Sequence, residues 1–159
     1  MEMMSVSNSS LVSYIKISPN KTVSRNKKVT KITIHHCAGN LSLETIGNIF
    51  SNVNAQASAN YGIDSNGRVG LYVDEKDRAW TSSSASNDHQ AITIEVANDE
   101  ISGNWYVSDK ALNKLVDLCV DICKRNGIKK LGYTGDVSGS LTRHNMFAST
   151  VCPRPVFTK

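Results

Sequence analysis

The stretch KITIHHCAG, residues 31–39, decides the fold of this chain. Its first four residues form a run rich in β-branched side chains, which predicts a strand that ends at His35 and His36. Successive side chains of a strand point to opposite faces of its sheet. Only one of the two histidines can therefore face a shared site. The residues alone leave open that one caps the core and the other is solvated.

A second strand is predicted over residues 91–97, with the sequence AITIEVA. Strand alternation places Ile92, Ile94 and Val96 on one face and Glu95 on the other. The Glu95 carboxylate is therefore expected to lie away from the apolar side of this strand.

Residues 61–73 predict a β-hairpin, because Asn66-Gly67 offers the positive φ angles that a tight turn requires. Residues 108–126 predict a helix that packs on the sheet and stops at Gly127. Its apolar positions recur with helical spacing. They are Leu112, Leu115, Val116, Cys119, Ile122 and Cys123.

A shorter helix is expected over residues 42–50, with Ser42 as its N-cap. Residues 52–60 and 82–88 are small and polar, so both are expected to be loops. With no internal repeat, these elements predict an α/β fold in which α-helices flank a mixed central β-sheet.

The length of 159 residues predicts one domain, residues 1–159, with residues 1–29 as an extended N-terminal arm. No apolar run approaches the roughly 20 residues that cross a bilayer, so membrane insertion is not expected. The start lacks the basic and apolar regions of a secretory signal. We therefore expect synthesis in the cytoplasm and action elsewhere only after release.

The formal net charge is +4, and basic residues gather between Lys21 and Lys31. No aromatic side chains interleave with them as stacking platforms, so a nucleic-acid partner is not expected. The stretch is either an ordinary solvated surface or a region attracted to an anionic polymer such as a bacterial wall.

Metal-ligand residue types stand at both ends of the sequence, as His35, His144 and Cys152. Two imidazoles and a thiolate supply three corners of a zinc tetrahedron, and the open fourth corner is typical of a catalytic ion. Pro153 and Pro155 stiffen the chain after Cys152. The remaining thiols, Cys37, Cys119 and Cys123, are interpreted as packing residues.

Four ordered motifs resemble the zinc-dependent N-acetylmuramoyl-L-alanine amidases of the amidase-2 family, which also contains the peptidoglycan recognition proteins. The motifs are TIHHCAGN, ASANYGIDSNGRVGLYVDEKDRAW, AITIEVAN and HNMFASTVCPRP. Within the family, the chain is most similar to catalytic domains of phage endolysins that act on clostridial walls. The similarity runs from about residue 10 to the end and includes no cell-wall-binding domain.

The resemblance implies hydrolysis of the amide between N-acetylmuramic acid and L-alanine in peptidoglycan. It implies that His35, rather than His36, binds Zn²⁺ together with His144 and Cys152. It further implies that Glu95 is the general base, and that Tyr61 and Thr150 help to hold the oxyanion.

The chain departs from the family pattern at three places. Thr150 stands where some members have a lysine, and Thr81 stands where many relatives have a histidine. Arg154 replaces the glycine of the usual CPG, which bears on the backbone just after the metal ligand.

Two other function classes remain open at this point. The first is a peptidoglycan-binding module without catalysis, although the branch members that lose activity commonly lose the cysteine ligand, and Cys152 is present. The second is a thiol hydrolase with Cys37 as nucleophile and His36 or His89 as base. The sequence leaves the oligomeric state and the wall chemotype open.

Overall fold

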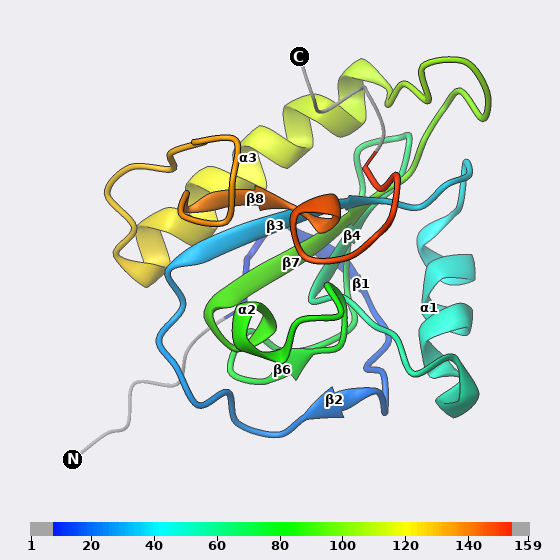
Figure 1. Cartoon of the computed structure of the whole chain (residues 1–159). Coiled ribbons are helices and arrows are strands. Elements are labelled where there is room, and N and C mark those ends of the chain that lie inside the picture. The colour runs from blue at the N-terminus through cyan, green and yellow to red at the C-terminus, as the bar shows by residue number, and fades with distance from the viewer. Residues whose placement is uncertain (1–7, 154–159) are drawn as a thin grey trace.

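A computed structural model describes residues 8–153, whose centre is a six-stranded sheet (Figure 1). Its strand order is β1-β5-β4-β7-β3-β8. The β4–β5 pair is antiparallel, and the other neighbouring pairs are parallel. The strands are β1 (Val12–Ile15), β3 (Lys31–His36), β4 (Tyr61–Ile63), β5 (Val69–Leu71), β7 (Ala91–Val96) and β8 (Leu141–Arg143). The predicted mixed α/β sheet is confirmed.

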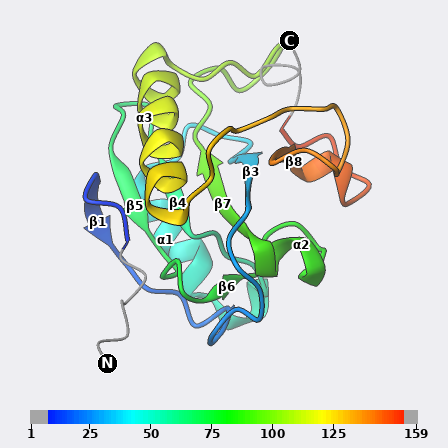
Figure 2. The same cartoon turned by 90° about the vertical axis from the view of Figure 1, so that its left-hand side faces the viewer.

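The long helix α3 (Asp109–Asn126) covers one face of this sheet (Figure 2). The Ser108 hydroxyl caps its first turn by accepting from the Ala111 N–H, and Gly127, at φ +70°, ends it. The predicted limits are confirmed, but the buried stripe is only partly the predicted one. It consists of Ala111, Leu115, Leu118 and Ile122, whereas Leu112 and Val116 remain 43% and 55% exposed. Cys119 and Cys123 pack beside this core as free thiols.

Helix α1 (Leu43–Ser51) packs near the other face. Its predicted cap is confirmed, because the Ser42 hydroxyl accepts from the Thr45 N–H. Tyr72 joins this helix to the sheet, since its hydroxyl donates to the Leu43 carbonyl at 2.7 Å. Its ring lies against Gly62 and Gly70. A Cβ would stand 2.8 Å from the Tyr72 Cε2 atom at Gly62 and 2.7 Å from the Tyr72 hydroxyl oxygen at Gly70. Only glycine leaves room for the ring at these two strand positions.

The loops are more ordered than the sequence suggested. Residues 52–60 contain the short 3₁₀ helix η1 (Val53–Ala55), and residues 82–88 run into α2 (Ala85–Gln90). The Ser84 hydroxyl caps α2 by accepting from the Asn87 N–H, so the prediction of a loop there was wrong. In the β4–β5 hairpin only Gly67, at φ +78°, takes a positive φ, and the Asp64 carboxylate accepts from the Asn66 and Arg68 N–H groups.

The N-terminal segment contributes strands rather than only lying over the domain. β1 forms one edge of the main sheet, and β2 (Lys21–Thr22) pairs with β6 (Arg78–Ala79) in a separate two-stranded ribbon. After β8, the chain forms the 3₁₀ helix η2 (His144–Met146). None of the helices in residues 8–153 has the length and apolar character needed to span a bilayer.

Candidate metal centre and active site

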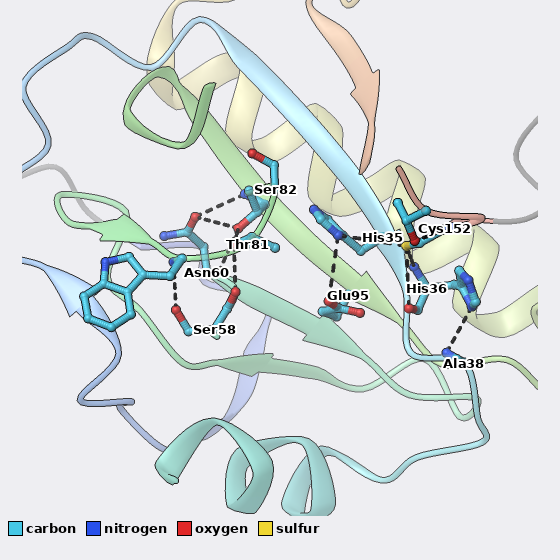
Figure 3. Close-up of polar contacts among 12 residues, drawn as sticks. His35, His36, Ala38, Ser58, Asn60, Thr81, Ser82, Glu95 and Cys152 are labelled. Carbon is cyan, nitrogen blue, oxygen red and sulfur yellow. Dashed lines mark hydrogen bonds and ion pairs between the residues drawn. The ribbon is translucent and has the colours of Figure 1, made fainter. Parts of the chain in front are cut away.

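Parallel pairing of β3 with β7 places two predicted site residues side by side. His35 and Glu95 are register partners, and both point to the face opposite α3. The His35 Nδ1 atom lies 3.9 Å from Glu95 Oε1 (Figure 3). His36 belongs to the opposite face, where its ring lies 5.9 Å from that of Trp105 and its Nδ1 lies 3.1 Å from Asn98 Oδ1. The alternation thus separates the two histidines as predicted.

Strand β8 brings the second imidazole to His35. β8 pairs in parallel with β3, so that Ile34 lies opposite Arg143 and His144 follows at the end of the strand. The ring centroids of His35 and His144 are 4.5 Å apart. The two histidines therefore meet although 109 positions separate them in the chain.

A loop then returns the thiol of Cys152 to the same place. The Asn145 N–H donates to the Cys152 carbonyl at 2.9 Å, which closes the loop between His144 and Cys152. The Cys152 Sγ atom accepts from the His36 N–H at 3.3 Å and lies 4.0 Å from His35 Nδ1. One possible ligand atom from each of His35, His144 and Cys152 lies within 4.8 Å of the other two.

These three residues fit a tetrahedral metal ion. Zinc with its usual bond lengths holds a nitrogen and a sulfur ligand roughly 3.6 Å apart, close to the 4.0 Å seen here. The Nε2 atom of His144 is buried and lacks a hydrogen-bond partner among the described residues. Such unpaired buried polar atoms are rare and point to a missing ligand. Burial, followed by the neighbouring His144, holds the pKa of His35 well below its usual value, so the imidazole is neutral as metal binding requires.

The Glu95 carboxyl lies beside this cluster and keeps 17% of its side-chain surface exposed. Burial raises its pKa to about 8, and a hydrogen bond with the Cys37 thiol acts in the opposite direction. A carboxyl group with a pKa near neutrality is suited to general acid–base catalysis. Next to it is an apolar pocket of about 150 Å³ between β3 and α1. The pocket is lined by His36, Cys37, Leu41, Ile46, Ile49, Phe50 and Glu95.

Tyr61 does not reach this site, which corrects the role expected from the sequence. It pairs with Ile94 of β7, so its ring is fully buried on the α3 side of the sheet. Its hydroxyl donates to Glu75 Oε2 at 2.9 Å and accepts from the Ser9 N–H at 2.9 Å. The residue on the same face as Glu95 is Gly62, one position later.

The remaining predicted positions have separate outcomes. Thr150 lies in the loop beside the cluster, where its hydroxyl accepts from the Cys152 N–H at 3.2 Å. Thr81 belongs to a polar network and donates to the Ser58 carbonyl at 2.7 Å. Arg154 lies outside the described residues.

The sequence did not reveal how far that polar network extends along the site face (Figure 3). Thr33 and Thr93 lie on the same face as His35 and Glu95, and the Thr93 hydroxyl is 2.8 Å from that of Thr81. The buried Asp88 carboxylate accepts from Ser82 and from the Thr81 N–H. Its pKa is raised, because burial outweighs these hydrogen bonds. The alternating threonines were the available signal for this polar face.

The fold and site together define a class of protein: a hydrolase whose two histidines and one cysteine stand beside a carboxylate on an α/β sheet. The amidase-2 family profile, described as N-acetylmuramoyl-L-alanine amidase, matches residues 25–155. The chain belongs to this family and is an N-acetylmuramoyl-L-alanine amidase, an enzyme that acts on peptidoglycan.

Solved structures share the fold. The catalytic domain of XlyA has a TM-score of 0.72 at 15% identity, and the match covers 92% of each chain. PlyL has a TM-score of 0.68 at 18% identity, covering 88% of this chain and 85% of that one. The N-acetylmuramoyl-L-alanine amidase LysC from Clostridium intestinale URNW has a TM-score of 0.63 at 20% identity, covering 84% and 82%. No curated protein sequence matches the chain.

Proposed function

We propose that the chain is a zinc-dependent amidase in which His35, His144 and Cys152 bind the ion and Glu95 is the general base. In this proposal it is the catalytic domain of an endolysin or autolysin and cuts between N-acetylmuramic acid and L-alanine. The observation that carries the proposal is the convergence of three ligand atoms within 4.8 Å beside the Glu95 carboxylate. Zinc bound there supplies Lewis-acid chemistry, which polarises a carbonyl and makes water more acidic.

Glu95 is placed to move protons during the reaction. Its carboxylate takes a proton from the attacking water and passes it to the leaving amine of L-alanine. The apolar pocket beside it offers space for the small aliphatic groups that flank the scissile amide.

Thr150 is proposed to help stabilise the oxyanion. Its hydroxyl oxygen accepts from the Cys152 N–H, and a hydroxyl that accepts still has its own proton to donate. A donor aimed at the developing negative charge lowers the barrier of acyl transfer. The positioning of this hydroxyl depends on the same loop that holds Cys152.

The thiol-hydrolase alternative has little support in the geometry. Burial and the neighbouring Glu95 carboxylate both raise the pKa of the Cys37 thiol, whereas a nucleophilic cysteine needs a lowered pKa. The Nδ1 atom of His89, one of the two proposed bases, accepts from the Asn26 N–H. Cys37 is better explained as a packing residue next to the carboxylate.

Metal analysis combined with a wall digest tests the proposal. The purified protein should contain about one zinc per chain, and a chelator should abolish the release of L-alanine amino termini from peptidoglycan until zinc is restored. Reducing sugar ends should stay constant, because no glycosidic bond is cut. Full activity after complete metal removal, or new reducing ends without new amino termini, would overturn the proposal.

A further inference from the structure

A second cavity, of about 620 Å³, lies far from the metal cluster. It opens where residues 24–29 lead into β3 and where α3 ends at Arg125, Asn126 and Gly127. Val29 in its wall precedes His35 by six residues, which corresponds to roughly 20 Å along an extended chain. We call this cavity the basic pocket. It is separate from the active site.

The basic pocket has a local excess of positive charge. Its charged lining residues are Arg25, Lys27, Lys28, Lys76, Arg125 and Glu75. Five cations and one carboxylate leave an excess of four positive charges, which equals the net charge of the protein. The other thirteen basic and thirteen acidic residues balance. The basic stretch noted in the sequence is therefore one side of a built cavity.

The carboxylate in the basic pocket is already neutralised. Glu75 is fully buried and accepts hydrogen bonds from Arg125, Asn126 and Tyr61. It leaves little negative charge to compensate the other cations of the pocket.

Arg25 is fixed without a carboxylate in contact with it. Its guanidinium donates to five backbone carbonyls, and the burial that accompanies these bonds lowers its pKa to about 10. The Lys27, Lys28 and Lys76 ammonium groups make no hydrogen bond or ion pair with any residue in the range 8–153. One anchored arginine and three exposed lysines without ion-pair partners among residues 8–153 make this pocket a region of positive potential that attracts anions.

The lining also restricts the kind of anion. Among residues 8–153, no aromatic side chain borders the basic pocket, so this part of the chain provides no platform on which a nucleobase could stack. We propose that the basic pocket binds phosphodiester groups of a base-free anionic polymer of the bacterial wall. The inference rests on the wall as the place of action. It goes beyond the amidase site, because the polymer would bind the enzyme at a surface that takes no part in the reaction and so hold it on the wall.

Tethering has a kinetic consequence. A bound polymer raises the effective concentration of the enzyme at its insoluble substrate without changing the chemistry at Glu95. The benefit should fall as salt screens the contacts, since the Debye length shrinks from about 30 Å at 0.01 M to 10 Å at 0.1 M. Soluble muropeptides carry no such polymer, so their hydrolysis should not depend on the basic pocket.

Calorimetric titration of the zinc-loaded protein with soluble poly(glycerol phosphate) tests the proposal. The variant Lys27→Gln/Lys28→Gln/Lys76→Gln should bind at least about tenfold more weakly at roughly 50 mM salt and show a shallower salt dependence. The matched control Lys110→Gln/Lys114→Gln/Lys130→Gln removes the same charge outside the pocket lining and should bind like the wild type. Circular dichroism and equal turnover of a soluble muropeptide check that both variants are folded.

Each outcome bears on the proposal. Selective weakening in the pocket variant supports it. Equal weakening in both variants, or no binding by the wild type, overturns it. Single-stranded DNA bound as tightly as the polymer would contradict the proposal that the ligand has no bases. Inorganic phosphate bound as tightly would contradict the proposal that the ligand is a polymer. Because the titration requires no turnover, a failure here is distinguishable from a failure of the amidase proposal.

Discussion

His35 and Glu95 are direct register partners on neighbouring parallel strands, with 3.9 Å between Nδ1 and Oε1. Both side chains leave the sheet on the same face, opposite α3. The position of the proposed base relative to the metal cluster is thus fixed by backbone pairing within the sheet interior. His144 directly follows β8, which pairs with β3, and only Cys152 is brought to the cluster by a loop.

Glu95→Gln should separate catalysis from metal binding. The amide keeps the shape of the side chain but removes the proton acceptor, so wall lysis should fall roughly 100 to 10,000 fold. Zinc content should be unchanged, because Glu95 is outside the three-ligand cluster. Glu44→Gln and Glu100→Gln are controls outside the site. Activity within a few fold of wild type in Glu95→Gln would exclude the base role.

Cys152→Ser should weaken zinc binding by roughly 100 fold or more, because serine does not supply an anionic ligand near neutral pH. Inductively coupled plasma analysis after dialysis measures the loss. His36→Ala is the internal control, since His36 lies on the other face of the sheet and should retain the ion. Full zinc occupancy in Cys152→Ser would remove this thiol from the site.

Tyr61→Phe should cost stability and not activity. The change removes a donor to the buried Glu75 carboxylate and an acceptor for the Ser9 N–H. The free energy of unfolding should fall by about 1 to 3 kcal/mol, as measured by urea denaturation. The kcat on soluble muropeptide should stay within about twofold of wild type. A roughly 100-fold drop of kcat in a folded Tyr61→Phe protein would show that the Tyr61 hydroxyl is catalytic, in contrast to its position in the structure.

Thr150→Val should lower kcat roughly 10 to 1,000 fold if the hydroxyl stabilises the oxyanion. Thr150→Ser keeps the hydroxyl and should retain most of the activity. Zinc analysis of both variants shows whether the Cys152 loop has moved, because the hydroxyl also accepts from the Cys152 N–H. Equal activity in the valine and serine variants would exclude a role of the Thr150 hydroxyl in stabilising the oxyanion and leave only its contact within the loop.

Cys119 should make the protein less stable at alkaline pH. Burial raises the pKa of its thiol to about 12 in the folded state. In the unfolded chain the thiol ionises near pH 8.5, so rising pH favours unfolding between these two values. Between pH 7.5 and 9.5 this effect amounts to about 1 kcal/mol. Urea midpoints at both pH values should show a smaller alkaline loss in Cys119→Ala; an identical loss would contradict the assignment.

The sequence predicted those features that depend on local periodicity. Alternation along β7 placed Glu95 away from the apolar face, and alternation along β3 separated His35 from His36 without saying which of them faces the site. Ser108 and Gly127 marked the limits of α3. The proposed metal ligands came from residue types and family resemblance, and the structure brings all three residues together.

Features that depend on strand register were not predictable in this way. A shift of one residue in register exchanges the two faces of a strand. The register that pairs Tyr61 with Ile94 is set by the packing of distant strands, so the sequence did not show that Tyr61 faces away from the site. The helix α2 was missed because its serine-rich start resembles a loop until Ser84 is seen to cap it. In α3, Leu118 is buried, whereas Leu112 and Val116, which the sequence predicted to be buried, are exposed. The angle at which a helix packs on a sheet determines which of its residues are buried.

The separation along the chain between the three proposed metal ligands has a consequence during synthesis. His35 and Cys152 are 117 positions apart, and His144 reaches the cluster only through the pairing of β8 with β3. A nascent chain that has grown only as far as α3 already contains His35 and Glu95, yet it lacks two of the three ligands. With the proposed ligand set, hydrolytic competence requires that β8 has been synthesised and has docked on β3.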